Sequence, residues 1–143
     1  MNNSIFSTKF LVLDLESIAQ RLIHPEDGLG WNSQQASRAV ERYKMFLCLI
    51  YLYPNRAFVP TREIDIVWHF HILDTCKYAD DCERLFGYYL HHNPNFYAEN
   101  EVDNLVFVEG FNNTIALFAE CFGIRLTEEN NQLQQASACV DPQ

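Results

Sequence analysis

The chain has 143 residues, a hydrophobic fraction of 48%, and only five Gly and five Pro, which excludes collagen-like, low-complexity and wholly disordered proteins. This length predicts one globular domain whose core is large enough to fold without disulfide bridges. Ten Lys and Arg against nineteen Asp and Glu give a net charge of -9, which argues against binding to nucleic acid or to an anionic membrane.

The N-terminus and the cysteines predict a cytoplasmic protein. Residues 1–7 lack the basic and apolar parts of a secretory signal, and no uninterrupted apolar window approaches the roughly eighteen residues of a membrane span. The five cysteines are an odd number, and most lie inside apolar segments, which argues against a secreted disulfide framework. We therefore expect a protein that stays in the cytoplasm and binds no membrane.

Apolar residues recur at intervals of three and four in the N-terminal half and predict two helices. The first is expected over residues 10–23 and ends before the segment 24–30, which contains a proline and two glycines. The second is expected over residues 31–52, with Asn32 or Ser33 as its N-cap and a wide apolar stripe along one side.

The segment 64–73 fits two periodicities. Its apolar residues alternate as in a strand, but they also form a helical stripe. We predict a helix, because Pro60 and Thr61 suit a helix start and because Glu63 and Asp65 lie in the first turns, where the helix dipole favours acidic side chains.

The remaining segments also favour helices. Asp74 resembles a new N-cap, so a further helix is expected over residues 75–86, with Gly87 as its left-handed C-terminal residue. A last long helix is expected over residues 100–122, ended by Gly123.

These elements predict an all-α fold, a single-domain bundle of about four to five helices. We assign residues 1–123 to this domain. Residues 124–143 are rich in Asn, Gln and Glu, and we expect them to form a mobile polar tail with no catalytic role.

Four of the five histidines lie in one stretch that also contains Cys76, Cys82, Asp74 and Asp81; they are His69, His71, His91 and His92. On a helix, His69 and His71 are about 200° apart and cannot share one metal ion. Asp65 then shares the face of His69, whereas Tyr78 and Cys82 share the face of His71. On a strand, by contrast, the two histidines would project to the same side.

The composition of this stretch predicts a transition-metal site for zinc or iron, because imidazole and thiolate are ligands that these ions accept. We expect His71 and Cys82 as ligands, together with His91 or His92. The residues expected to support these ligands are Asp65, Trp68, His69, Tyr78 and Asp81. An open coordination position would supply Lewis-acid or bound-water chemistry, in which case the protein is an enzyme.

Two alternatives compete with the metal site. In a nucleophilic site Cys82 would attack, His71, His91 or His92 would act as base, and Asp74 or Asp81 would orient it. No glycine-rich turn adjoins Cys82, however, and a cysteine in mid-helix lacks the dipole that lowers a thiol pKa. In a non-catalytic interaction module the cluster would be a structural polar network, and the acidic surface would meet a protein partner.

Three motifs occur in order: WHxH at residues 68–71, YxxDC at residues 78–82 and FGxxxHH at residues 86–92. This succession resembles the glycine-rich domain-containing protein-like family, and the resemblance covers roughly residues 11–123. It implies an all-helical domain that stands alone in bacteria and is joined to glycine-rich regions in plants. With only five glycines, this chain is expected to be the bacterial stand-alone form. The resemblance implies no particular activity, and it leaves open whether the partner is a small molecule or a protein.

Overall fold

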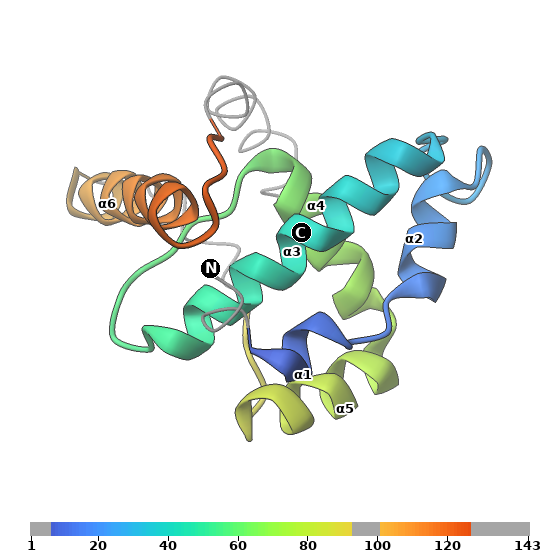
Figure 1. Cartoon of the computed structure of the whole chain (residues 1–143), viewed down its shortest axis with the longest axis horizontal. Helices are drawn as coiled ribbons and strands as arrows, with labels where there is room; N and C mark the ends of the chain where they lie inside the picture. The colour runs from blue at the N-terminus through green and yellow to red at the C-terminus, as the bar shows by residue number, and fades with distance from the viewer. Residues whose placement is uncertain (1–6, 93–100, 127–143) are drawn as a thin grey trace.

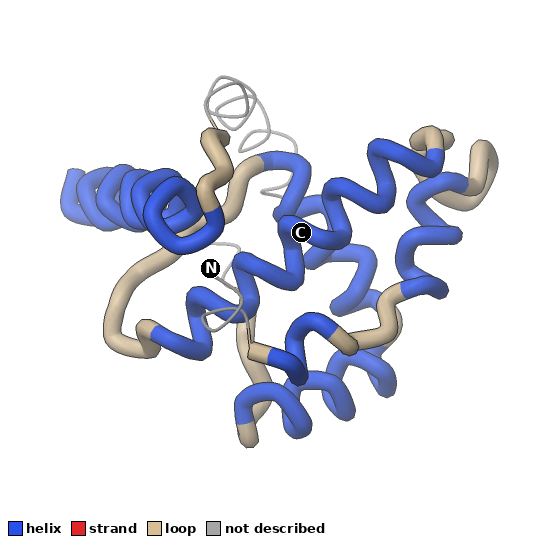
Figure 2. Tube along the Cα trace, in the orientation of Figure 1, coloured by secondary structure: helices blue, strands red, loops and turns tan. Residues whose placement is uncertain are grey.

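The computed structural model describes residues 7–92 and 101–126 (Figure 1). All regular secondary structure in these two ranges is helical (Figure 2), which confirms the predicted all-α fold. The described residues form six helices, five of them seven residues or longer. In chain order the elements are α1 (Thr8–Leu11), α2 (Glu16–Ile23), α3 (Ser33–Leu52), α4 (Arg62–Leu73), α5 (Thr75–Phe86), α6 (Glu101–Leu117) and the π-helical turn η3 (Phe118–Phe122).

The first predicted helix is divided into α1 and α2, so the prediction of one continuous helix is wrong. Between them, the Asp14 carboxylate accepts a hydrogen bond from the backbone N–H of Glu16 at 3.1 Å. Such a local bond competes with the helical hydrogen-bond pattern. Leu13 and Leu15, on either side of Asp14, are both buried in the core. The break therefore allows two neighbouring leucines to contribute to the core.

The helix α3 runs through the middle of the molecule (Figure 1), and α1, α2 and α4 all contact it. At its start the Asn32 side chain accepts a hydrogen bond from the backbone N–H of Gln35 at 2.8 Å, which satisfies a donor of the first turn. Its apolar stripe is buried over most of its length and includes Tyr43 and Phe46, both without exposed surface. The predicted helix and its cap are confirmed.

The segment that fitted both a strand and a helix is the helix α4. Thr61 is its N-cap and accepts a hydrogen bond from the N–H of Ile64. At Asp74, with φ -86° and ψ 77°, the helix ends and α5 begins. Gly87, with φ 81°, ends α5 in the left-handed conformation. The predicted break at Asp74 and the predicted stop at Gly87 are confirmed, but the Asp74 side chain forms no capping hydrogen bond in the described part of the chain.

The last helix, α6, lies at one end of the molecule beside the segment 57–59 (Figure 1). The N–H of Val59 donates to the carbonyl of Gly110 and to the hydroxyl of Thr114, each at 3.2 Å. A side chain at Gly110 would bring its Cβ to 2.8 Å from Cγ2 of Val59. A larger residue would therefore displace Val59, so glycine permits the close contact that holds α6 against the connection between α3 and α4.

The C-terminal part of the long predicted helix is not α-helical. Its last turn is η3, which buries Phe118 and Cys121 before Gly123, with φ 71°, ends the helix as predicted. Leu126 is also buried. From residue 127 onward, the predicted polar tail lies outside the described residues.

The segment Leu105–Phe122 is long and apolar enough to cross a membrane by length and composition, with a mean hydropathy of 1.3, and 28% of it is buried in the fold. Core helices of soluble proteins satisfy the same criteria, so length and hydropathy do not distinguish the two cases. The expectation that the protein binds no membrane stays a prediction.

The short helix α1 is held between α3 and α5. The Lys9 ammonium donates to the carbonyl of Leu85 at 2.6 Å and lies 3.9 Å from the centre of the Tyr51 ring. Phe10 is completely buried, and its ring packs against those of Tyr51 and Phe86. A cation at the C-terminal end of α5 complements the helix dipole, so α1 stabilises α5 as well as covering the core.

Candidate functional site

The two histidines of α4 lie on different faces of the helix, as expected for a helical segment. His71 is buried, with 1% of its surface exposed, and contacts α3 and α5 through Tyr43 and Asp81. His69 packs instead against His92, with ring centres 5.6 Å apart. The polar residues of this region therefore form two groups, an inner network around His71 and an outer cluster around His69.

Both ring nitrogens of His71 are hydrogen-bonded in the inner network. Nδ1 lies 2.8 Å from the Tyr43 hydroxyl, and Nε2 lies 2.9 Å from Oδ2 of Asp81. Because a carboxylate only accepts, we assign the ring proton to Nε2, and Nδ1 then accepts from Tyr43. In this arrangement neither nitrogen offers a lone pair to a metal ion.

Asp81 is the charged centre of the inner network and has 1% of its side chain exposed. Besides His71 it meets the Lys77 ammonium at 3.1 Å and the Arg84 guanidinium. Burial lowers the pKa of His71 below its ordinary value, and the hydrogen bond and charge of Asp81 oppose this shift. Two cations and a neutral imidazole thus compensate one buried carboxylate.

Trp68 and Tyr78 connect the inner network to the chain that follows α5. The Trp68 indole N–H donates to the Tyr78 hydroxyl at 2.9 Å, and that hydroxyl donates to the carbonyl of Leu90. Cys82 lies beside them with 2% of its surface exposed, and burial raises the pKa of its thiol. A thiol that stays protonated near neutral pH is a poor nucleophile, which argues against the cysteine-based alternative.

The outer cluster consists of Asp65, His69 and His92. Each residue offers one ligating atom, and these atoms all lie within 4.8 Å of one another. Nε2 of His92 is 2.6 Å from Oδ1 of Asp65, and the two side chains are 10% and 1% exposed. Among the described residues, the second carboxylate oxygen of Asp65 and Nδ1 of His69 are buried and have no hydrogen-bond partner.

Two segments of the chain supply the residues of the outer cluster. Asp65 and His69 are four residues apart on α4, a spacing that places side chains next to each other on one helix face. The chain reversal after Gly87 returns His92 to this face, where its ring packs 4.3 Å from that of Trp68. Since Trp68 is itself held by Tyr78, the outer cluster rests on the inner network.

The structure distributes the predicted site residues between these two groups. Of the four predicted ligands, His92 is in the outer cluster, His71 and Cys82 are in the interior, and His91 is exposed next to Tyr89. Asp65 and His69, predicted as supporting residues, supply the other ligating atoms. In the ranges 7–92 and 101–126, no other group of three His, Cys, Asp or Glu residues is arranged to hold a metal ion.

Sequence reasoning missed three members of the inner network. Lys77 and Arg84 lie four residues before and three residues after Asp81, a helical spacing that could have indicated them. Tyr43 lies 28 residues before His71. A buried tyrosine hydroxyl requires a partner, but no local pattern identifies which one.

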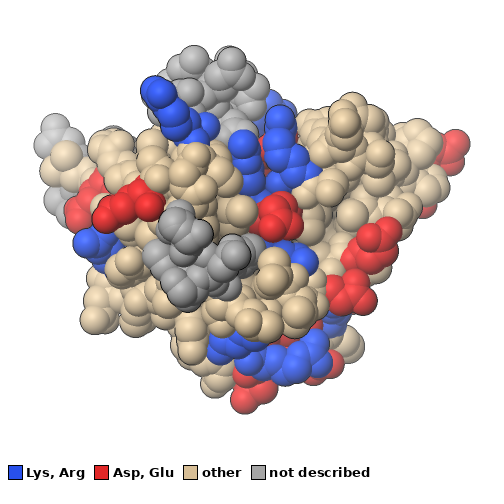
Figure 3. All heavy atoms as spheres, in the orientation of Figure 1, with Lys and Arg blue, Asp and Glu red and all other residues tan. Residues whose placement is uncertain are grey.

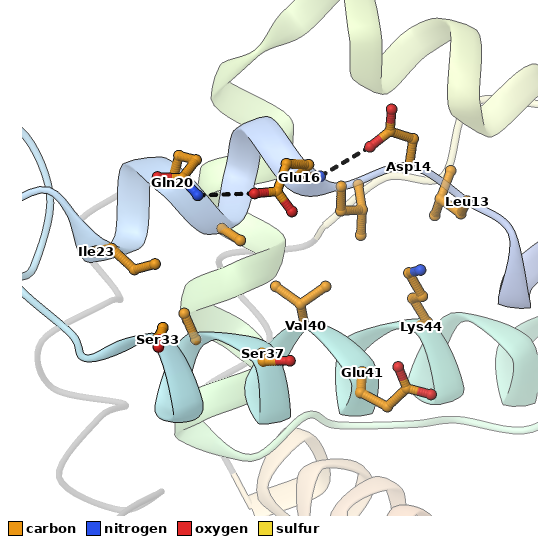
Figure 4. A pocket seen from close by; sticks show the side chains of 13 residues that line it. Leu13, Asp14, Glu16, Gln20, Ile23, Ser33, Ser37, Val40, Glu41 and Lys44 are labelled. Atoms are coloured by element: carbon orange, nitrogen blue, oxygen red, sulfur yellow. Dashed lines mark hydrogen bonds between the residues drawn. The ribbon is translucent and has the colours of Figure 1, made fainter.

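A cavity of about 380 Å³ lies between α2 and α3, lined by residues other than those of the two groups (Figure 4). Three of its charged groups are already bonded within the protein: Asp14 accepts from the backbone of Glu16, Glu16 accepts from Gln20 at 2.8 Å, and Lys44 donates to the carbonyl of Leu11. The described residues that line this cavity include no buried polar atom without a partner, whereas the outer cluster includes two.

Comparison with known proteins agrees with the family expected from the sequence. The model of a family described as UCP032817-like matches residues 16–111. Two Arabidopsis thaliana proteins, glycine-rich domain-containing proteins 1 and 2, are 37% and 36% identical to this chain over 91 residues. Each match covers 61% of this chain and 11% of the relative, so the chain corresponds to a small part of those proteins. No solved structure matches significantly.

Proposed function

The chain belongs to the UCP032817-like family, and from this premise we propose that its outer cluster binds a divalent transition-metal ion, zinc or ferrous iron. The family match includes Asp65, His69 and His92. The relationship to glycine-rich domain-containing proteins agrees with the family expected from the motifs. The bacterial stand-alone form stays a prediction.

One observation carries the proposal: two potential ligand atoms in a three-residue group are buried without a partner. An unpaired buried polar atom costs about 1–3 kcal/mol, and here Asp65 and His69 each contain one. A bound cation would satisfy both atoms together. It would also take the place of the close contact between His92 and Asp65.

The ligand types favour zinc or iron over calcium or magnesium. Two imidazoles and one carboxylate form a nitrogen-rich set, whereas calcium and magnesium prefer oxygen ligands. Three protein ligands leave at least one coordination position for water or substrate. A metal-dependent reaction at this site is therefore the extension of this proposal.

The inner network supports the structural alternative for its own residues. Every ring nitrogen of His71 and both oxygens of Asp81 have partners, so a metal is not needed to satisfy them. We propose that these residues hold α3, α4 and α5 together and position Trp68 behind His92. In this view His71 and Cys82 support the site and bind no metal.

Metal analysis of protein purified without an affinity tag tests the proposal. After equilibration with zinc or ferrous iron and removal of the excess by gel filtration, we expect about one ion per chain, as in other single mononuclear sites. His69→Ala and His92→Ala should each lose the ion. His91→Ala is the matched control, because this neighbouring histidine is exposed and lies outside the outer cluster.

Thermal unfolding provides a second measurement. A ligand at a hundred times its dissociation constant stabilises the native state by about 2.7 kcal/mol, so added metal should raise the Tm of the wild type and of His91→Ala. It should not raise the Tm of Asp65→Asn. If neither ion is retained and neither ion raises the Tm of well-folded wild-type protein, the proposal is wrong.

A further inference from the structure

A second cavity lies where the N-terminal ends of α3 and α4 meet. Its volume of about 410 Å³ is within the range of small-molecule sites, about 300–1,000 Å³. The six lining residues combine apolar and charged side chains: Leu29, Trp31, Gln35, Arg62, Glu63 and Ile66. None of them belongs to the outer cluster or to the inner network.

Glu63 contributes a buried and only partly satisfied carboxylate to this cavity. The residue is 8% exposed, and its Oε2 accepts a hydrogen bond from Arg38 at 2.7 Å. Its Oε1 is buried without a partner among the described residues. Since nearly all buried polar atoms in proteins are hydrogen-bonded, this oxygen fits a ligand that supplies an N–H donor.

Arg62 contributes the opposite charge at the same cavity. Within residues 7–92 and 101–126 its guanidinium forms no hydrogen bond or ion pair. Because guanidinium groups bind carboxylates in a planar, two-pronged geometry, Arg62 fits an anionic group on the ligand. Glu63 already pairs with Arg38, so Arg62 is an additional cation at the cavity and favours a ligand with a carboxylate.

The remaining wall is apolar. Trp31 and Ile66 are half-buried, and Leu29 is 47% exposed at the mouth. An indole ring provides a flat apolar surface for an aliphatic or aromatic side chain. The cavity thus combines an acceptor for an ammonium group, a cation for a carboxylate and a surface for an apolar side chain.

From this combination we propose that the cavity binds a free α-amino acid with an apolar side chain. The ammonium group donates to Oε1 of Glu63, the carboxylate pairs with Arg62, and the side chain packs against Trp31. This site is separate from the proposed metal site, and neither one requires the other.

Titration calorimetry with L-leucine, L-methionine, L-phenylalanine and L-tryptophan tests the proposal. The protein is used metal-free in the presence of EDTA, because amino acids chelate metal ions and would otherwise report on the outer cluster. At least one of the four should bind. L-phenylalaninamide and N-acetyl-L-phenylalanine, which each lack one charge, should bind about tenfold or more weakly than L-phenylalanine, since each loses a charged hydrogen bond.

Variants test whether Glu63 and Arg62 bind the two charged groups of the amino acid. Glu63→Gln and Arg62→Gln should each weaken binding about tenfold or more, while Arg21→Gln, which removes an exposed arginine from α2, and Asp65→Asn in the outer cluster should leave it unchanged. Circular dichroism checks that each variant is folded. If Glu63→Gln does not fold, Arg62→Gln still tests the proposal. This variant lacks the proposed partner of the carboxylate, so it should bind L-phenylalanine and L-phenylalaninamide equally.

Three results would each overturn the proposal. The first is that none of the four amino acids binds to folded wild-type protein. The second is that Arg62→Gln and Arg21→Gln bind equally well. The third is that Asp65→Asn abolishes binding, which would move the ligand to the outer cluster. None of these results bears on metal retention, which is measured without amino acids.

Discussion

At the scale of single residues, the histidines of this stretch have different roles, and His71 has a structural one. Its neighbours are a hydroxyl that donates and a carboxylate that accepts, which together fix one neutral tautomer. His69, two residues away, keeps a buried nitrogen without a partner. The same residue type therefore stabilises the interior at one position and is available as a ligand at the other.

The sequence predicts which residues of α4 lie on the same face of the helix. It does not predict which residues of other segments contact each face. A step of 100° per residue groups Asp65 with His69 and separates both from His71, as the structure shows. The choice of His92 over His91 depends on the chain reversal after Gly87. Tyr43 reaches His71 from another helix, so tertiary packing decides this contact and no local pattern contains it.

Replacing Tyr43 by phenylalanine should destabilise the protein by about 1–3 kcal/mol, because it leaves Nδ1 of His71 buried without a donor. Urea unfolding measures this change as a lower midpoint with an unchanged slope. Tyr51→Phe is the matched control: Tyr51 is 41% exposed, and its hydroxyl forms no hydrogen bond in the described part of the chain. Equal midpoints for the two variants would contradict the role assigned to Tyr43.

At the level of helices, several helix ends lie where the sequence predicts them. Asn32 caps α3, Asp74 separates α4 from α5, and Gly87 ends α5. The break around Asp14 and the π-helical turn η3 were not predicted. At these places the burial of Leu13, Leu15 and Phe118 in a shared core outweighs helix continuity, and burial against distant residues has no signature in the local sequence.

Gly87→Ala should cost about 1–2 kcal/mol of stability, because an L-residue is strained at positive φ. A Cβ at this position would meet no atom within 4 Å, so the cost is conformational and involves no clash. Gly87→Asn should lose less, since asparagine tolerates the left-handed region better. Urea midpoints should rank wild type above Asn and Asn above Ala; a fully stable Ala variant would contradict the left-handed end of α5.

At the scale of the whole molecule, the charged side chains on one face lie in groups of both signs (Figure 3). On the face shown in Figure 3, basic side chains gather near the upper centre and along the lower edge, and acidic side chains lie beside both groups. The net charge of -9 is therefore not collected into one acidic surface on this side. The acidic protein-binding surface expected from the composition stays a prediction.

Alkaline pH should destabilise the whole fold. Burial raises the pKa of Tyr43 and of Tyr78 above the ordinary value of 10.0 and that of Cys82 above 9.0. The unfolded chain then releases these protons at lower pH than the native protein, so the free energy of unfolding falls as the pH rises above about 9. Each group contributes at most about 1.4 kcal/mol per pH unit.

Urea unfolding between neutral pH and about pH 11 measures this dependence, with the pH range chosen from the ordinary tyrosine value. The decline should be shallower in Tyr43→Phe than in the wild type, because this variant lacks one of the groups. A midpoint that stays constant to the end of this range would show that these side chains ionise as readily in the native protein as in the unfolded chain.

The opposite orientation of His69 and His71 restricts insertions and deletions in α4. One residue added or removed between Asp65 and His69 would turn everything beyond it by about 100°. His69 would then leave the side of Asp65, and His71 would leave the side of Tyr43 and Asp81. A substitution can therefore alter one group and spare the other, whereas a change of length between Asp65 and His69 disrupts both groups at once.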